Sequence, residues 1–310
     1  MALGTNHVTK TTADKFIPEI WSDEIVAAYK QNLVAANMFS KMSFKGKKGD
    51  TLHIPKPTRG AASVKAASTQ VTLIAATETE IQVLINKHYE YSRLIEDIVE
   101  TQALSSLRKF YTDDAGYALA KQVDTDLIQL GRAVGSGADY STSSTTTNAF
   151  IGSNGTTVYN STSSNAAALT DAAIRRSIQR LDDADVPMTD RCLIVPPTTR
   201  NTLMGLARFT EQAFVGDVGS SNTIRNGMIG DLYGVKAYVS TNADTAAGSS
   251  GTDRICLLAH KDAFVLAEQM GVRSQTQYKQ EYLGTLFTSD MLYGVAELRD
   301  SSAVALAVPA

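Results

Sequence analysis

The chain has 310 residues and a mass of 33.2 kDa, enough for one large or two modest domains. Hydrophobic residues make up 43% of it and charged residues 20%, as in an ordinary globular chain that can bury a sizeable core. The formal net charge of −3 argues against a dedicated nucleic-acid binder, because such proteins usually carry a net basic face.

The sequence has no pattern of a secreted or membrane-spanning protein. Residues 1–15 are polar and lack the apolar core of a signal peptide, and no stretch approaches the roughly 18 apolar residues of a membrane span. We therefore expect a protein made in the cytosol. Cys192 and Cys256 each lie in an apolar run and fit no zinc or redox spacing, which favours buried thiols over a disulfide.

Residues 1–43 begin polar and then become amphipathic. Trp21 stands among apolar residues that recur at helical spacings, namely Phe16, Ile20, Ile25, Tyr29 and Leu33. The pattern predicts an arm with a short helix and no core of its own.

Residues 44–90 predict a long β-hairpin with a loose tip. Two period-two stretches, 51–54 and 81–85, flank a polar segment of small residues, and Leu84 falls on the polar face. Two strands alone are marginal in water, so this hairpin needs a partner surface. Its first half is basic: residues 45–65 hold six positive charges and one negative charge, Asp50. That excess fits a solvated loop or a loop that docks on an acidic surface.

Residues 93–134 carry apolar side chains at steps of three and four without a proline. They predict one helix of about 40 residues, or two helices broken near Gly116. Residues 135–168, rich in Gly, Ser, Thr and Asn, predict a surface loop.

An α/β pattern follows, with β-rich sequence from residue 262 to the end. The expected elements are a helix capped by Thr170 and ended by Pro187, a buried strand at 193–195, a helix at 199–207, a polar loop at 214–226, and strands at 234–239 and 255–259.

Motifs for catalysis are missing from the sequence. The four histidines have no metal-ligand spacing, and there is no P-loop, dinucleotide fingerprint or nucleophile elbow. Asp124 and Asp126 are two residues apart on the predicted helix and cannot share a face. Asp182, Asp183 and Asp185 favour a solvated helix end over a metal site. We predict no catalytic, cofactor-binding or metal-binding residue.

The arm, basic hairpin, long helix and α/β segment occur in an order that resembles the major capsid (coat) proteins of tailed bacteriophages, most of all those of short-tailed phages. These proteins have the Hong Kong ninety-seven type of fold. The stretches that carry the resemblance are residues 20–25, 44–55, 191–197, 230–240 and 293–299.

The resemblance implies an α+β phage capsid fold in four parts. They are an N-terminal arm at 1–43, an extended loop (the β-hairpin) at 44–90, a peripheral domain with the spine helix at 91–134, completed by about 261–290, and an α/β axial domain at 135–260, completed by about 291–310.

The implied function is structural and not enzymatic. The chain would self-assemble into pentamers and hexamers that form an icosahedral head around double-stranded DNA. Implied partners are other copies, a scaffolding protein, a portal, a decoration protein, and DNA touched on the inner face without sequence specificity. The location would be the virion, after assembly in the host bacterial cytoplasm. An encapsulin-like compartment shell is the alternative; an α/β enzyme using the carboxylates around Asp182 is less favoured.

We expect subunit contacts at named residues. Lys56, Arg59 and Lys65 should meet an acidic patch of an adjacent subunit that includes Glu96 and Glu100, and the arm should contribute Trp21. Some members of the family also join a hairpin lysine to an asparagine of a neighbour. This chain has no asparagine after Asn242, so we expect a shell held by non-covalent contacts.

Overall fold

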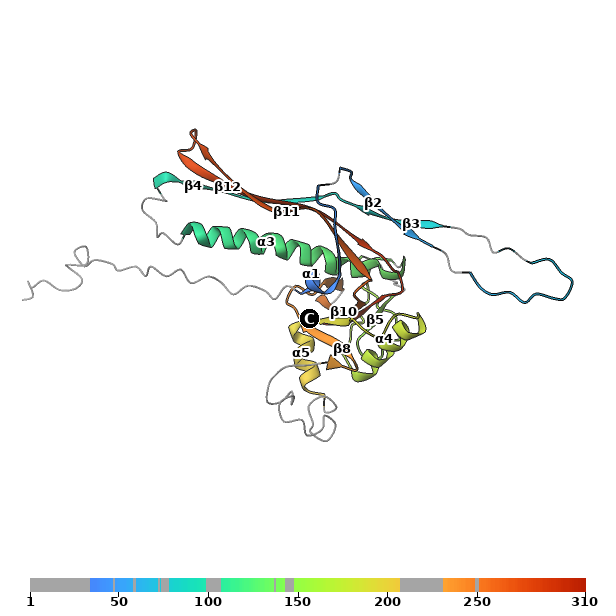
Figure 1. The fold of residues 1–310 in the computed structure, drawn as a ribbon. Helices are drawn as coiled ribbons and strands as arrows, with labels where there is room; N and C mark the ends of the chain where they lie inside the picture. The colour runs from blue at the N-terminus through green and yellow to red at the C-terminus, as the bar shows by residue number, and fades with distance from the viewer. Residues whose placement is uncertain are drawn as a thin grey trace, which may run out of the picture.

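The computed structural model of the chain describes residues 34–46, 48–57, 60–71, 73, 78–98, 107–136, 138–142, 148–206, 231–248 and 251–310. A long sheet runs along one side of helix α3 (Leu107–Gln129), and a smaller α/β layer lies on its other side (Figure 1). A hairpin extends away from both. The predicted arm before residue 34 and the polar loop at 214–226 lie outside the described residues.

The α/β layer is built on a sheet that has β10 (Gly251–His260) at its centre. Along the sheet the described strands follow the order β5 (Ala149–Ile151), β13 (Ala303–Pro309), β10, β6 (Arg191–Val195), β8 (Val235–Val239) and β7 (Asp231–Leu232), and β9 (Thr245–Gly248) pairs with part of β10. Every residue of β6 is buried, because both faces of the sheet are covered. The predicted strands at 193–195, 234–239 and 255–259 are confirmed.

Helices α4 (Asp171–Asp183) and α5 (Pro197–Met204) cover one face of this sheet. The hydroxyl of Thr170 accepts a hydrogen bond from the backbone N–H of Ala173, which confirms the predicted cap. Cys256 faces these helices, whereas Cys192 on the neighbouring strand faces α3. Both thiols are free and buried, as predicted, and they lie on opposite faces of the sheet.

Helix α3 packs between the two sheets. Leu119, Val123 and Leu127 share one apolar core with residues of the α/β sheet and with Phe264 and Tyr293 of the long sheet. This is why an unusually long helix is stable here: apolar surface covers it on two sides.

The long sheet has β12 (Gly284–Glu297) between β11 (Phe264–Lys279) and β4 (Lys87–Glu96). Strand β1 (Ser40–Ser43) pairs in parallel with the first part of β11. All ten residues of β4 pair with β12, from Lys87 opposite Tyr293 to Glu96 opposite Gly284. On its other side β12 pairs with β11 as far as Glu297, and β13 of the α/β sheet begins at Ala303.

The predicted helix at 93–134 is wrong at both ends. Residues 93–96 belong to β4, because their pairing with β12 outweighs the helical spacing of their apolar side chains. The helix continues through Gly116, so the alternative of a break there is also wrong, and it ends at Gln129. A 3₁₀ segment, η2 (Leu130–Ser136), follows and contains a kink. Residues 99–106 lie outside the described residues.

The predicted hairpin is confirmed as β2 (Thr51–Lys56) paired with β3 (Thr79–Leu84). Leu52 stands opposite Val83 and Ile54 opposite Ile81, and this apolar face packs on Val265 of β11. The N-terminal part of the described chain is the short helix α1 (Ala35–Met38), which packs against α3. In the described part of the chain, no helix is both long and apolar enough to cross a membrane.

Candidate subunit-contact surfaces

The far part of the hairpin is basic and apolar and lies away from the rest of the chain (Figure 1). Lys56 ends β2 with an exposed side chain, and Lys65 is exposed in the extended segment beyond it. Val64, Val71 and Leu73, also exposed, are apolar. We call Lys65, Val64, Val71 and Leu73 the distal hairpin. Of the other predicted contact residues, Arg59, Glu100 and Trp21 lie outside the described residues.

Glu96 lies at the opposite end of the molecule from the distal hairpin. It is the last residue of β4 and is exposed, where β4 and the turn between β11 and β12 end together (Figure 1). The structure therefore does not bring Lys56 or Lys65 near Glu96 within one chain. A contact between these charges requires two copies.

An exposed apolar cluster, which we call the tip patch, surrounds this end of the sheet. Its members are Ile98, Tyr278, Tyr282 and Leu283. The backbone N–H of Asp97 donates to the carbonyl of Leu283 at 2.9 Å, and the hydroxyl of Tyr278 donates to Asp97 Oδ2 at 2.7 Å. This hydrogen bond raises the pKa of Tyr278. Sequence reasoning missed the patch, although adjacent Tyr282 and Leu283 in a charged turn were a signal.

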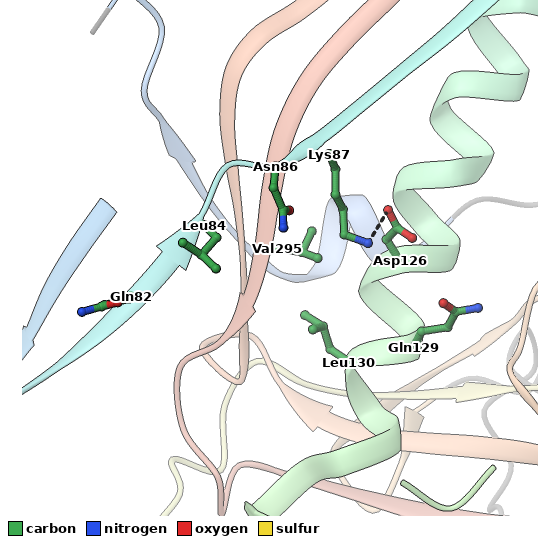
Figure 2. A pocket seen from close by; sticks show the side chains of 8 residues that line it. All are labelled: Gln82, Leu84, Asn86, Lys87, Asp126, Gln129, Leu130 and Val295. Atoms are coloured by element: carbon green, nitrogen blue, oxygen red, sulfur yellow. Dashed lines mark ion pairs between the residues drawn. The ribbon is translucent and has the colours of Figure 1, made fainter. Parts of the chain in front are cut away.

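A notch of about 300 Å³ lies where the hairpin joins the rest of the chain, between β3 and α3 (Figure 2). Its lining mixes amides, aliphatic side chains and one ion pair: Gln82, Leu84, Asn86, Lys87, Asp126, Gln129, Leu130 and Val295. The Lys87 ammonium lies 3.1 Å from Asp126 Oδ2. Asp126 is buried, and the hydroxyl of Tyr293 and the amide of Gln122 also donate to it. Burial and the hydrogen bond to Asp126 raise the pKa of Tyr293.

The end of β3 crosses close over Gly294 of β12 where the hairpin joins the long sheet. A Cβ atom at this position would lie 2.3 Å from the carbonyl oxygen of Leu84, far inside van der Waals contact. Only glycine lets the end of β3 pass this close to β12. Together with the Lys87 and Asp126 pair, this contact fixes the direction in which the hairpin leaves the body.

Asp124 joins three separate parts of the chain. It is fully buried; its Oδ1 accepts from the backbone N–H of Ala35 at 2.7 Å and its Oδ2 from the amide of Asn242 at 3.0 Å. The N-terminus of α1, helix α3 and the turn after β8 are thereby held together. Asp124 and Asp126 point to different partners, which confirms that they do not share a face of the helix.

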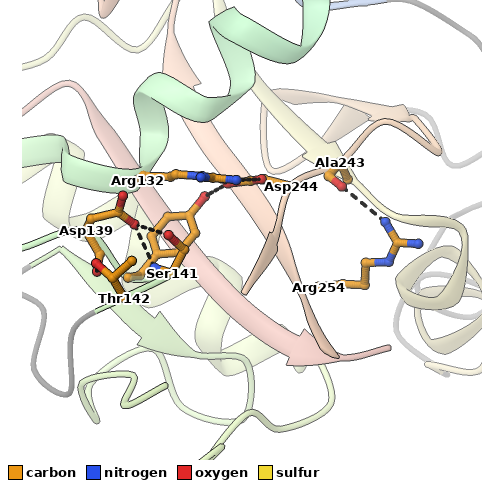
Figure 3. A network of polar contacts seen from close by, with 8 residues as sticks. Arg132, Asp139, Ser141, Thr142, Ala243, Asp244 and Arg254 are labelled. Carbon is orange, nitrogen blue, oxygen red and sulfur yellow. Dashed lines mark hydrogen bonds and ion pairs between the residues drawn. The ribbon is translucent and has the colours of Figure 1, made fainter. Parts of the chain in front are cut away.

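A second polar network fixes the junction after α3 (Figure 3). Arg132 of η2 makes two hydrogen bonds of 2.7 Å to buried Asp244, and the hydroxyl of Tyr140 donates to the same carboxylate at 2.7 Å. Burial, with Asp244 beside it, raises the pKa of Tyr140 well above its usual value. The charges of Arg132 and Asp244 pair with each other inside the chain, so this network stabilises the fold.

Asp182, at the end of α4, is also paired within the chain. Asp182 Oδ1 lies 2.7 Å from Nη2 of the buried Arg191. Among the residues that the structure describes, no three of His, Cys, Asp and Glu are placed to hold one metal ion.

Comparisons with known proteins agree with this architecture. A family model described as phage capsid protein matches residues 40–306. A solved structure from Mycobacterium phage Che8 is similar over 94% of this chain and 97% of its own, with a TM-score of 0.74 and 23% identity. The capsid structure of cyanophage P-SCSP1u is similar over 99% of this chain and 96% of its own, with a TM-score of 0.75 and 20% identity.

A third similar structure is the capsid asymmetric unit of cyanophage Pam1, which covers 99% of both chains with a TM-score of 0.74 and 15% identity. At these identities the likeness concerns the fold. No curated protein matches the chain.

Proposed function

The chain belongs to the phage capsid protein family, and from this premise we propose that it is the major subunit of an icosahedral phage head. Copies would form pentamers and hexamers that close around double-stranded DNA. The observation that carries the proposal is the hairpin. Its two paired strands and exposed apolar tip extend from the body, and such a ribbon is marginal in water unless another surface covers it.

The proposed division of labour follows the two sheets. The arm at 1–43 and the extended loop at 44–90 would join neighbours, and the long sheet with α3 would form the peripheral domain. The α/β layer would be the axial domain at the centre of each capsomer. Strand pairing supports assigning residues up to Glu297 to the peripheral domain and residues 303–309 to the axial domain.

Further partners belong to the same proposal. A scaffolding protein, a portal and a decoration protein would bind the shell, and packaged DNA would touch its inner face without sequence specificity. Assembly would take place in the host bacterial cytoplasm. The role would be structural and need no catalysis, which fits carboxylates that are bound internally, such as Asp182 by Arg191.

Charge pairs would set the register between neighbours. We propose that Lys56, Arg59 and Lys65 of one subunit face Glu96 and Glu100 of the next, with Trp21 of the arm at the same interface. Exposed pairs contribute only about 0–1 kcal/mol each, but a shell repeats them many times. Reversing Arg59 and Lys65 to Glu should lower the yield of particles and make that yield less sensitive to salt. Reversing Lys236 and Lys261, which are exposed in the α/β layer, should change neither quantity. Unchanged yield would refute this docking.

The direct test of the function is imaging of the expressed chain, with a nucleic-acid assay of particles from native infection. Closed shells that contain DNA are the expected result. Shells that enclose enzymes and no genome would instead support the encapsulin-like alternative. A soluble protein that forms no shell and gains activity with a metal or nucleotide would favour the enzyme.

A further inference from the structure

Many tyrosines of the chain donate their hydroxyl to an aspartate. The sequence has 12 tyrosines, and among the residues that the structure describes six of them make such a bond. In three of these pairs both side chains are buried, at oxygen–oxygen distances of 2.7, 2.7 and 2.6 Å. We call these three the buried pairs: Tyr140 with Asp244, Tyr159 with Asp253, and Tyr293 with Asp126.

The buried pairs lie in separate parts of the fold. The pair of Tyr293 joins β12 of the long sheet to α3, and the pair of Tyr159 joins the segment after β5 to β10 of the α/β layer. The pair of Tyr140 joins the segment after η2 to the residue before β9. The partners are 167, 94 and 104 positions apart in the chain. Each pair therefore holds together segments that only tertiary packing brings near.

The phenol proton is what holds each pair together. An ionised carboxylate only accepts hydrogen bonds, so the tyrosine must supply the proton. If the tyrosine lost it, two anions would face each other at hydrogen-bond distance in a site that water does not reach. Burial, with the aspartate beside it, raises the pKa of Tyr140, Tyr159 and Tyr293.

The charges around Tyr140 and Tyr159 do not compensate a second anion. Arg132 shares the carboxylate that Tyr140 binds and opposes the rise of the tyrosine pKa, whereas the nearby Asp139 adds to it. Around Tyr159, the hydroxyl of Ser164 donates to the same carboxylate at 2.9 Å. In both sites the anions would outnumber the cations once the tyrosine is ionised.

The same holds for Tyr293. The ammonium of Lys87 lies 3.1 Å from the carboxylate oxygen that Tyr293 binds, and the ring of Tyr89 stacks on that of Tyr293 with centroids 5.9 Å apart. One cation would then face an aspartate and a tyrosinate. Because none of the three sites accommodates the ionised phenol, each tyrosine loses its proton only when its pair opens.

A raised pKa has a definite consequence for stability. A tyrosine whose pKa is raised by folding stabilises the fold fully below its unfolded-state value of about 10, and this contribution is lost as the pH rises above that value. We propose that the three buried pairs form an alkaline switch, which keeps the two sheets and their junction closed up to about pH 10 and opens them together above it. The switch is a property of the single chain, so it goes beyond the proposed function and holds whether or not copies build a shell.

The first test follows the tyrosinate absorbance and the circular dichroism of the purified full-length chain as the pH is raised from about 8 to about 12. At least three tyrosines should stay protonated until the circular dichroism signal is lost, and should then ionise with it. Ionisation of all 12 tyrosines while the circular dichroism is unchanged would overturn the proposal.

The second test removes one phenol proton and keeps the ring. Tyr159→Phe should lower the urea midpoint of unfolding at about pH 8, and its difference from wild type should shrink at about pH 11, where the wild-type pair has lost its contribution. Tyr282→Phe is the matched control, because Tyr282 is 62% exposed, and it should shift the midpoint at neither pH. A difference of the same size at both pH values would contradict the switch. If Tyr159→Phe does not fold, Tyr293→Phe serves for the same comparison, and the absorbance titration of the wild-type chain decides by itself.

Discussion

Tyr293 donates a hydrogen bond of 2.6 Å to Oδ2 of Asp126, the oxygen that also lies 3.1 Å from the ammonium of Lys87. The carboxylate is on α3, the tyrosine on β12, and the lysine at the start of β4. One buried charge thus ties helix α3 to the long sheet and to β4, the strand that follows the hairpin. Removing either Tyr293 or Lys87 leaves the buried Asp126 carboxylate less well compensated. The loss of folding stability is then larger than the net contribution of the contact itself.

We therefore expect Lys87→Met to lower the free energy of unfolding of the dissociated subunit by about 1–3 kcal/mol, a range reduced because solvent reaches Lys87. Tyr293→Phe should cost about 1 kcal/mol. Lys121→Met on the same helix is the control and should change it by less than about 0.5 kcal/mol. Urea unfolding measures all three. Equal effects of Lys87→Met and Lys121→Met would contradict the assigned role of the pair.

Gly294 gives a sharper test of the hairpin root. Gly294→Ala places a Cβ atom 2.3 Å from the carbonyl oxygen of Leu84, so the strand must move and stability should fall by about 1–3 kcal/mol. Gly116→Ala is the matched control, because a Cβ atom there meets nothing within 4 Å in a helix interior and should stabilise by about 0.5–1 kcal/mol. Unchanged or increased stability of Gly294→Ala in urea unfolding would show that β3 does not pass tightly over β12 here.

Acid should weaken the long sheet through Asp290. Arg273 donates hydrogen bonds of 2.8 and 3.1 Å to it, and with His88 at 3.2 Å lowers the pKa of Asp290 below its ordinary value of 3.8. A lowered pKa stabilises the fold fully above the unfolded-state value, and this contribution is lost as the pH falls below it. From about pH 5 to pH 3, wild type should lose more stability than Asp290→Asn. Because Arg273 is half exposed, added salt should shrink the difference.

A denaturing gel of mature particles should show one band near 33 kDa, with or without reductant. Burial raises the pKa of Cys192 and of Cys256 to about 12, and the two thiols face opposite sides of one sheet, so they neither ionise readily nor meet. The hairpin lysines Lys56 and Lys65 find no asparagine in the C-terminal strands. A ladder that survives reductant would prove a covalent link between subunits.

Local patterns predicted the elements that depend on local rules. Thr170 caps its helix, and Ile81 and Val83 line the apolar face of the hairpin, because a cap and a period-two face are properties of neighbouring residues. The strand at 93–96 was missed because only its pairing with β12, some 190 residues later, distinguishes it from the helix that follows. Helical spacing alone cannot report a distant partner.

The candidate surfaces were predictable only in part. The charge of Lys56 and Lys65 is visible in the sequence, and the structure leaves both side chains exposed. The position of Glu96 opposite them, the tip patch around Asp97 and the notch beside Lys87 arise from strand pairing and from the packing of α3, which no local pattern encodes.

The central claim is that this chain builds a closed shell. The most direct measurement is sedimentation of the purified chain over a range of concentrations, alone and with a candidate scaffolding protein, followed by electron microscopy of the fast fraction. We predict capsomers of five and six subunits or whole icosahedral shells, and little stable monomer, because the hairpin needs a neighbour. A well-folded monomer that persists at high concentration and never assembles under any scaffolding condition would contradict the account.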